Sequence, residues 1–175
     1  MTKVDYTFKI LMMGSAGTGK TSLSERYITG LFNPDVRLTV GVDFYVKTVI
    51  VNNLTVKLQL WDMGGEKRFR FLLPNYSLGS SGGIFLYDIT RFDTLEALTD
   101  WITIVRERNG DIPILLVGNK IDLTNERKVP KDYGKKTQVL NKMVDFIEVS
   151  AKMGTNIEDV FTKLTEIMIS RLQKK

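Results

Sequence analysis

The segment Gly14-Ser15-Ala16-Gly17-Thr18-Gly19-Lys20-Thr21 decides the fold of this chain. It matches the phosphate-binding loop (P-loop) pattern G-x-x-x-x-G-K-[ST], whose glycines let the backbone turn so that successive N–H groups point at phosphate oxygens. The positive N-terminus of a helix starting near Lys20 would face the same anion. We therefore expect Lys20 to reach the β- and γ-phosphates of a nucleoside triphosphate and the Thr21 hydroxyl to bind Mg²⁺. The loop does not indicate which base is bound.

Strand-like and helical patterns alternate on both sides of this loop. Strands are predicted at 7–13, 43–51, 55–62, 83–89, 113–118 and 145–149. The link Asn52-Asn53 is so short that 43–51 and 55–62 must form an antiparallel hairpin. We predict a single α/β domain over residues 1–175, with three layers and a P-loop after its first strand. Its six-stranded sheet is mostly parallel, with one antiparallel strand, and it carries five helices.

The helices are predicted from their apolar spacing and their end signals. One spans 20–29, with Leu23, Tyr27 and Ile28 on one face and Gly30 as its C-cap, and another is marked by Leu95, Leu98, Ile102 and Val105 and ends at Asn109-Gly110. Pro130 fits the first position of a helix that ends near 141, and Thr155-x-x-Glu158 predicts a capping box for the closing helix. The apolar stripe of the closing helix consists of Ile157, Val160, Phe161, Leu164, Ile167 and Met168.

The composition limits the chemistry that the chain can perform. It has 175 residues, a net charge of +5, and neither cysteine nor histidine. This excludes a disulfide scaffold, a serine–histidine triad and a metal held by thiolate or imidazole. Chemistry must therefore use carboxylates, hydroxyls, lysines, backbone amides and a hard metal such as Mg²⁺. The positive charge fits nucleic acid, an anionic membrane, a phosphorylated ligand or simply solvated lysines.

Two loops that follow predicted strands indicate the base. Asp122 of Asn119-Lys120-Ile121-Asp122 could accept from guanine N1–H and from its N2 amine, neither of which adenine offers. The stem of Lys120 could pack on the base plane. After the last strand, in Ser150-Ala151-Lys152, the Ala151 N–H could donate to guanine O6. These loops favour guanine over adenine.

Over its full length the chain resembles the Ras superfamily of small GTPases, and most of all its Rab branch. The branch is indicated by 40–44 (VGVDF), 57–61 (KLQLW), 68–72 (RFRFL) and 86–90 (LYDIT), together with Asp62-x-x-Gly65 and the loops described above. The resemblance implies that the three-layer P-loop domain over residues 1–175 is a G domain. It implies a switch that binds GTP or GDP with Mg²⁺ and hydrolyses GTP. Its switch loops would be 33–44 and 63–77, where partners sense which nucleotide is bound.

The resemblance also implies individual roles. Phe32 would stack on the guanine edge, Thr39 would complete the Mg²⁺ shell with the γ-phosphate, Asp62 would hold Mg²⁺ through water, and the Gly65 amide would bond the γ-phosphate. Phe44, Trp61 and Tyr76 match the aromatic triad through which Rab proteins contact effectors, although simple core packing would also explain Phe44 and Trp61. The expected nucleotide-binding residues are Gly14, Ser15, Ala16, Gly17, Thr18, Gly19, Lys20, Thr21, Ser22, Phe32, Thr39, Gly65, Asn119, Lys120, Asp122, Ser150, Ala151 and Lys152.

Two departures from the family bear on catalysis, for which Lys20, Thr39, Gly65 and Glu66 are the expected residues. Glu66 stands where the family has the glutamine that orients the attacking water. A carboxylate can accept from water, but it cannot donate to the γ-phosphate and it adds negative charge there. Ala16 places a methyl group beside the γ-phosphate, where Ras has glycine and Rab proteins commonly have serine. We expect slow intrinsic hydrolysis, unless both changes are neutral variation, and an arginine at position 37 or 70 could assist from within the chain.

A third departure concerns membranes. The chain has no cysteine for the prenyl group that Rab proteins carry, and Thr2 excludes N-myristoylation. It also lacks an apolar run of about 18 residues and the apolar core of a secretory signal. We expect a cytoplasmic protein without a lipid anchor in this chain, whose membrane contact is indirect or weak.

The leading hypothesis is a GTP-hydrolysing switch that serves membrane traffic through effectors, exchange factors and GTPase-activating proteins. A second hypothesis is a GTP-dependent binding module with negligible turnover. A third, a P-loop ATPase or a nucleic-acid-associated GTPase, is disfavoured by the base loops and by the absence of a basic stripe interleaved with aromatic residues. We therefore expect no nucleic-acid partner.

Overall fold

Six strands form one sheet in the computed structural model, which describes residues 3–175. Thr2, on which the exclusion of myristoylation depends, lies outside that range. The strands are β1 (Tyr6–Met13), β2 (Val42–Val51), β3 (Leu54–Met63), β4 (Gly82–Asp88), β5 (Ile114–Asn119) and β6 (Asp145–Glu148). Their order across the sheet is β2-β3-β1-β4-β5-β6, and only the β2–β3 pair is antiparallel. The predicted α/β sheet is confirmed.

The β2–β3 hairpin turns at Asn52 and Asn53, as predicted. Both residues have positive φ, 51° and 63°, and Val51 pairs with Leu54 across the turn. Asparagine tolerates this left-handed conformation better than most residues, and two successive positive φ values match the twist of a tight hairpin.

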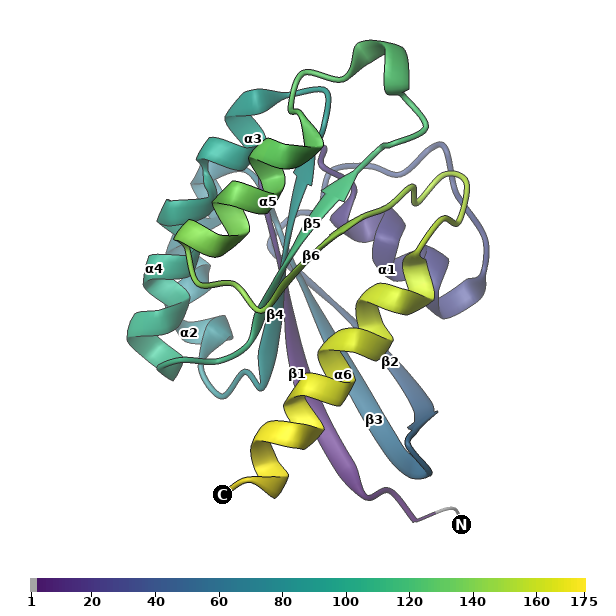
Figure 1. The fold of residues 1–175 in the computed structure, drawn as a ribbon, viewed down its shortest axis with the longest axis vertical. Coiled ribbons are helices and arrows are strands. Elements are labelled where there is room, and N and C mark those ends of the chain that lie inside the picture. The colour runs from purple at the N-terminus through teal and green to yellow at the C-terminus, as the bar shows by residue number, and fades with distance from the viewer. Residues whose placement is uncertain (1–2) are drawn as a thin grey trace.

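Helices cover both faces of the sheet (Figure 1). They are α1 (Lys20–Thr29), α2 (Leu73–Ser77), α3 (Phe92–Glu96), α4 (Leu98–Asn109), α5 (Lys131–Leu140) and α6 (Ile157–Gln173), with two 3₁₀ turns, η1 (Lys67–Leu72) and η2 (Thr124–Glu126). Helices α1 and α6 lie on one face, and α2 to α5 lie on the other. Because α3 and α4 meet at Ala97, which keeps a helical conformation, the helical stretches number five, as expected.

The strands bury alternate residues in the two layers. In β1, Ile10 and Met12 join the cluster beneath α1 and α6, whereas Leu11 and Met13 join the cluster beneath α2, α3 and α4. Successive strand side chains point to opposite faces, so a central strand covered on both sides is apolar at every position. This accounts for the uninterrupted apolar run from Ile10 to Met13.

Two predicted helix starts are wrong. The residue before α5 is Pro130, which takes an extended conformation at the N-cap position rather than the first helical position. The capping box at Thr155 does not form, because its backbone N–H and C=O bond to Ser150 in an isolated bridge and α6 begins only after Asn156, whose φ is 60°. Within α6, Ile169 is buried and Ile167 is only half-buried, so the apolar stripe is shifted at its end. The C-cap at Gly30 is confirmed, with φ 76° and its N–H bonded to the Arg26 carbonyl.

No helix within residues 3–175 is long and apolar enough to cross a membrane.

Candidate nucleotide-binding site

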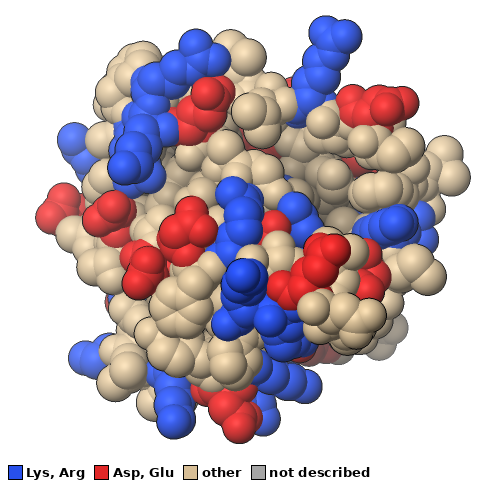
Figure 2. All heavy atoms as spheres, turned by 90° about the horizontal axis from the view of Figure 1, so that it is seen from above, with Lys and Arg blue, Asp and Glu red and all other residues tan. Residues whose placement is uncertain are grey.

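A cavity of about 350 Å³ opens where β1 and β5 end. Figure 2 looks down on this end of the molecule, which is hollowed, with Lys and Arg side chains running through its middle. Its lining combines the P-loop, the segment that follows α1, the start of the second switch and the two base loops. The lining residues are Ala16, Gly17, Gly19, Lys20, Thr21, Ser22, Phe32, Asn33, Pro34, Val36, Arg37, Leu38, Thr39, Gly65, Glu66, Asn119, Lys120, Asp122, Leu123, Ala151 and Lys152.

Most of the residues predicted for nucleotide binding meet at this cavity. Of that set, Gly14, Ser15, Thr18 and Ser150 do not line it. The cavity is also lined by residues that were not predicted to bind the nucleotide, namely Asn33, Pro34, Val36, Leu38 and Leu123. These are neighbours of Phe32, Thr39 and Asp122 in loops, and no spacing rule indicates which loop neighbours turn inward.

Lys20 is buried at the floor of the P-loop. Its Nζ donates to the carbonyl oxygens of Gly14 at 2.8 Å and of Ser15 at 3.1 Å. Burial lowers the pKa of Lys20 to about 8, although the charge of Asp62 acts in the opposite direction. An anion entering the cavity would offset this burial cost, because it stabilises the ammonium form.

The oxygens of Thr21, Thr39 and Asp62 converge at one edge of the cavity. Thr21 Oγ1 lies 2.7 Å from Thr39 Oγ1 and donates to Asp62 Oδ2, which is also 3.4 Å from Thr39 Oγ1. Asp62 is fully buried, and its second oxygen, Oδ1, has no hydrogen-bond partner. Burial raises the pKa of the Asp62 carboxyl, so a cation beside it would stabilise the ionised form. Two hydroxyls and a carboxylate are hard oxygen ligands and fit Mg²⁺.

The base loops are held to the P-loop and to each other. Asn119 is buried, its Nδ2 donates to the Thr18 carbonyl at 2.9 Å, and its Oδ1 accepts from the Ala151 N–H at 3.1 Å. Ser150 Oγ donates to Asp122 Oδ1 at 2.6 Å, which leaves the other carboxylate oxygen free for a further donor. Ser150 therefore orients Asp122, whereas Asp122 itself lines the cavity.

The second switch packs directly on the P-loop. A Cβ added at Gly65 would overlap the backbone of Ser15 and Ala16, and the Gly64 N–H donates to the Gly41 carbonyl of the first switch at 2.7 Å. The Glu66 side chain is about one-third exposed and pairs with Arg68 at 3.2 Å. Both switches therefore border the site.

Of the two arginines considered as internal aids, Arg37 lines the cavity and Arg70 does not. Arg70 stacks on the Trp101 ring at 4.7 Å and pairs with Asp100 of α4 at 3.7 Å. The role suggested for Arg70 is therefore wrong, since its charge is already engaged on the helical layer.

Phe44, Trp61 and Tyr76 form one aromatic cluster, which lies outside the cavity. The ring centroids of Phe44 and Trp61 are 5.1 Å apart, and those of Trp61 and Tyr76 are 5.8 Å apart. Phe44 is 46% exposed and Tyr76 is 39% exposed, so core packing does not explain Phe44. Lys9 Nζ lies 4.4 Å from the Trp61 ring centroid. The three rings provide an apolar surface between the two switches.

Arg91, whose Nη2 donates to the Ala16 carbonyl of the P-loop, and Asp88, which pairs with Arg91 and Lys120, were missed as site residues. They follow β4, and Asp88 was used only as part of a family motif. In an open α/β sheet the loops after parallel strands carry the ligand-binding residues, and this rule could have indicated the loop after β4.

This fold and this cavity define a class: an α/β protein that binds a nucleotide through a P-loop at the carboxyl edge of a mostly parallel sheet. The Ras family model matches residues 9–170. The chain is 35% identical over 172 residues to the Ras-related protein Rab-8B of Pongo abelii, covering 98% of this chain and 83% of the relative. It is 38% identical over 172 residues to the human Ras-related protein Rab-3A, covering 97% of this chain and 77% of the relative.

The chain belongs to the Ras family, and within it is Rab-like. It is accordingly a small GTPase, a molecular switch that binds GTP and GDP with Mg²⁺. The family expected from the sequence motifs is confirmed.

Proposed function

We propose that this protein is a slow GTPase switch of membrane traffic, which stays in its GTP-bound form for a long time unless an activating protein assists it. The observation that carries the slow rate is Glu66, which lines the nucleotide cavity. In the reaction the protein positions the attacking water and stabilises negative charge that develops on the phosphoryl oxygens. A carboxylate accepts from the water but offers no donor to those oxygens, and its charge opposes theirs.

Three other residues are proposed to take part at the γ-phosphate. Lys20 would neutralise charge on the β- and γ-phosphates, the Gly65 N–H would donate to the γ-phosphate, and the Thr39 hydroxyl would bind Mg²⁺ beside Thr21. Bound Mg²⁺ supplies positive charge that neutralises the phosphate oxygens. Asp62 is proposed to hold it through water, and the unpartnered buried oxygen of Asp62 supports this assignment.

Ala16 is proposed to slow hydrolysis further. Its place in the cavity lining and the packing of Gly65 against its backbone support this, because its methyl group would then occupy space beside the terminal phosphate. An arginine supplied by an activating protein would have to enter the same space.

Single-turnover GTP hydrolysis of the wild type and of Glu66→Gln tests this proposal. We expect the glutamine variant to be at least about ten-fold faster, because removing a single well-placed donor from such a site typically costs about 10²–10³ in rate. Glu107→Gln is the matched control, since Glu107 is exposed on α4 and the substitution removes the same charge. A wild type that equals or exceeds Glu66→Gln would refute the role given to Glu66.

The second candidate is a GTP-dependent binding module with negligible turnover. The pairing of Glu66 with Arg68 favours it, because a guanidinium that holds the carboxylate competes with the attacking water for its oxygens. The same assay separates the two: a binding module releases no phosphate over hours in the wild type, whereas a slow GTPase completes one turnover.

We further propose that segments 33–44 and 63–77 signal the nucleotide state to effectors, exchange factors and activating proteins, with the Phe44–Trp61–Tyr76 surface as part of the contact. Buried aromatic anchors dominate the energetics of many protein interfaces. The exposure of Phe44 and Tyr76 beside the switches supports this reading. The place proposed for this activity is the cytoplasm, with peripheral contact to membranes.

A further inference from the structure

A P-loop binds phosphate through its N–H groups, so its carbonyl groups need other hydrogen-bond partners. For residues 14–19 every carbonyl has one. Lys20 Nζ reaches those of Gly14 and Ser15, Thr18 Oγ1 also reaches that of Ser15, and Leu23 N reaches that of Gly19. The remaining three carbonyls, of Ala16, Gly17 and Thr18, accept only from side chains outside the loop.

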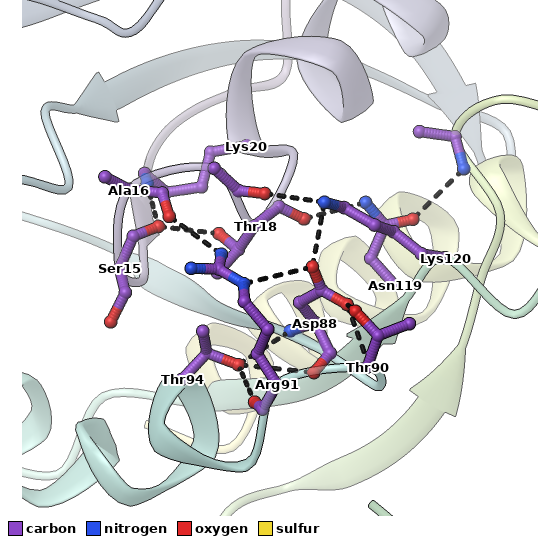
Figure 3. Close-up of polar contacts among 12 residues, drawn as sticks. Ser15, Ala16, Thr18, Lys20, Asp88, Thr90, Arg91, Thr94, Asn119 and Lys120 are labelled. Atoms are coloured by element: carbon purple, nitrogen blue, oxygen red, sulfur yellow. Dashed lines mark hydrogen bonds and ion pairs between the residues drawn. The ribbon is translucent and has the colours of Figure 1, made fainter. Parts of the chain in front are cut away.

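These three donors come from the loop after β4, from the last residue of β5 and from the loop that follows β5. Asn119 Nδ2 reaches Thr18 at 2.9 Å, and Lys120 Nζ reaches Gly17 at 2.8 Å. Arg91 Nη2 reaches the Ala16 carbonyl at 2.8 Å (Figure 3). Asn119 and Lys120 already belong to the base loop, whereas Arg91 belongs to none of the nucleotide-binding motifs.

One buried carboxylate fixes two of the three donors. Asp88 is 1% exposed, and its Oδ2 lies 2.8 Å from Lys120 Nζ and 3.3 Å from Arg91 Nε. Its Oδ1 accepts from the N–H and the hydroxyl of Thr90 at 2.9 and 2.7 Å. Burial alone would raise the pKa of Asp88, but the hydrogen bonds from Lys120 and Thr90 outweigh it, and the pKa lies below its usual value. Asp88 is therefore ionised and holds both cations against the loop.

The backbone at Arg91 is also fixed. The Arg91 N–H donates to the Asp88 carbonyl at 3.0 Å, and the hydroxyl of the buried Thr94 donates to the Arg91 carbonyl at 2.7 Å. A side chain that starts from a fixed backbone and is held by Asp88 loses little freedom when it bonds the P-loop. Its guanidinium also lies beside Gly17, where an added Cβ would be 3.3 Å from Nη2.

We propose that Arg91 is a positioning residue for the bound nucleotide: by holding the Ala16 carbonyl outward, with Asp88 behind it, it keeps the P-loop N–H groups directed at the phosphates and slows the release of GDP and GTP. Arg91 acts from the outer side of the loop, so its bonds need not break when a nucleotide binds. The proposal rests on the binding of guanine nucleotide and does not depend on the rate of hydrolysis.

The test is the dissociation rate of a fluorescent GDP from the Mg²⁺-loaded protein, chased with excess GDP. We expect Arg91→Gln to release it about ten-fold faster, because a hydrogen bond from a charged donor is lost at a loop that must stay ordered. Arg91→Lys should recover part of the loss, since it keeps the charge but cannot bond Asp88 and Ala16 together. Arg108→Gln on the exposed side of α4 is the matched control and should release GDP at the wild-type rate.

A ³¹P spectrum of bound GDP separates positioning from a general loss of structure. We expect the β-phosphate signal to shift in Arg91→Gln and to stay in place in Arg108→Gln. The proposal is overturned if Arg91→Gln releases GDP within about two-fold of the wild type, as removal of an ordinary surface ion pair would. It is equally overturned if release is faster while the ³¹P signal is unmoved and lysine gives no rescue. None of these readouts requires hydrolysis, so a failure of the slow-GTPase proposal would leave them unaffected.

Discussion

At the scale of single residues, the contact between Gly65 and Ala16 links the second switch to the P-loop. Gly65 lies against the backbone of Ser15 and Ala16. A methyl group added at its Cα would overlap those backbone atoms. The opposite side of Ala16 is held by Arg91 through the carbonyl. Ala16 is thus held by Arg91 and contacted by Gly65, so we expect a movement of Gly65 to displace the P-loop at Ala16.

Gly65→Ala is predicted to separate the second switch from the P-loop. The added methyl group cannot be accommodated by a flexible side chain, because its neighbours are backbone atoms. We expect single-turnover GTP hydrolysis to fall by about ten-fold or more, since small displacements of positioned groups are costly to catalysis. Circular dichroism and thermal unfolding should change little, because Gly65 lies in a loop outside the helices and strands.

Gly79→Ala is a control for the glycine substitution itself, because a Cβ there meets nothing within 4 Å. Gly79 has φ 77°, so this control carries the backbone cost of replacing glycine without a collision. Hydrolysis by Gly65→Ala at the wild-type rate would contradict the coupling between switch and loop.

At the scale of elements, α1 and α6 are joined by an aromatic stack. The rings of Tyr27 and Phe161 are parallel within 9°, with centroids 3.8 Å apart. Lys47 of β2 covers the other side, with Nζ 3.8 Å from the Tyr27 ring centroid and bonded to the Tyr27 carbonyl at 2.6 Å. Since α1 begins in the P-loop, this packing supports the loop from the far end of its helix.

Phe161→Ala is predicted to lower the free energy of unfolding by about 3–5 kcal/mol, the usual cost of removing a buried aromatic ring. Phe161 is fully buried and contacts Tyr27, so the cavity left behind cannot be filled by solvent-facing groups. Urea denaturation of the nucleotide-free protein measures the loss. Thr162→Ala, exposed on the same helix, should stay within about 0.5 kcal/mol of the wild type. A similar loss in both variants would show that the stack contributes nothing specific.

The sequence could predict those elements that depend on neighbouring residues, but not those that depend on contacts between separate segments. The strands, α1 with its Gly30 cap, and the Asn52-Asn53 hairpin depend on local chemistry, and they are where the sequence places them. The start of α6 depends on a pairing between Thr155 and Ser150, which competes with the capping box and leaves no local signal. Arg91 is another such case, because its contact joins residues 75 positions apart.

At the scale of the whole molecule, the centre of the sheet is buried throughout, whereas the two switch segments beside the site expose apolar side chains. Every residue of β4 and β5 is buried. By contrast, Val40 and Phe71, in the two switches, are each 73% exposed. Short loops with few buried contacts open at low free-energy cost, so a ligand that adds one bond to each can shift them.

Hydrogen exchange is therefore predicted to differ between GDP and a non-hydrolysable GTP analogue only in segments 33–44 and 63–77. With the analogue, amides there should exchange more slowly, because Thr39 is proposed to gain its contact to Mg²⁺, and Gly65 its contact to the γ-phosphate, only when that phosphate is present. The buried amides of β4 and β5 should exchange equally in both states. Thr39→Ala removes the hydroxyl that now joins Thr21 and Asp62, and should abolish the difference in 33–44. A difference spread over β4 and β5, or confined to the base loop 119–122, would mean that the nucleotide state is transmitted through the sheet rather than through the switches.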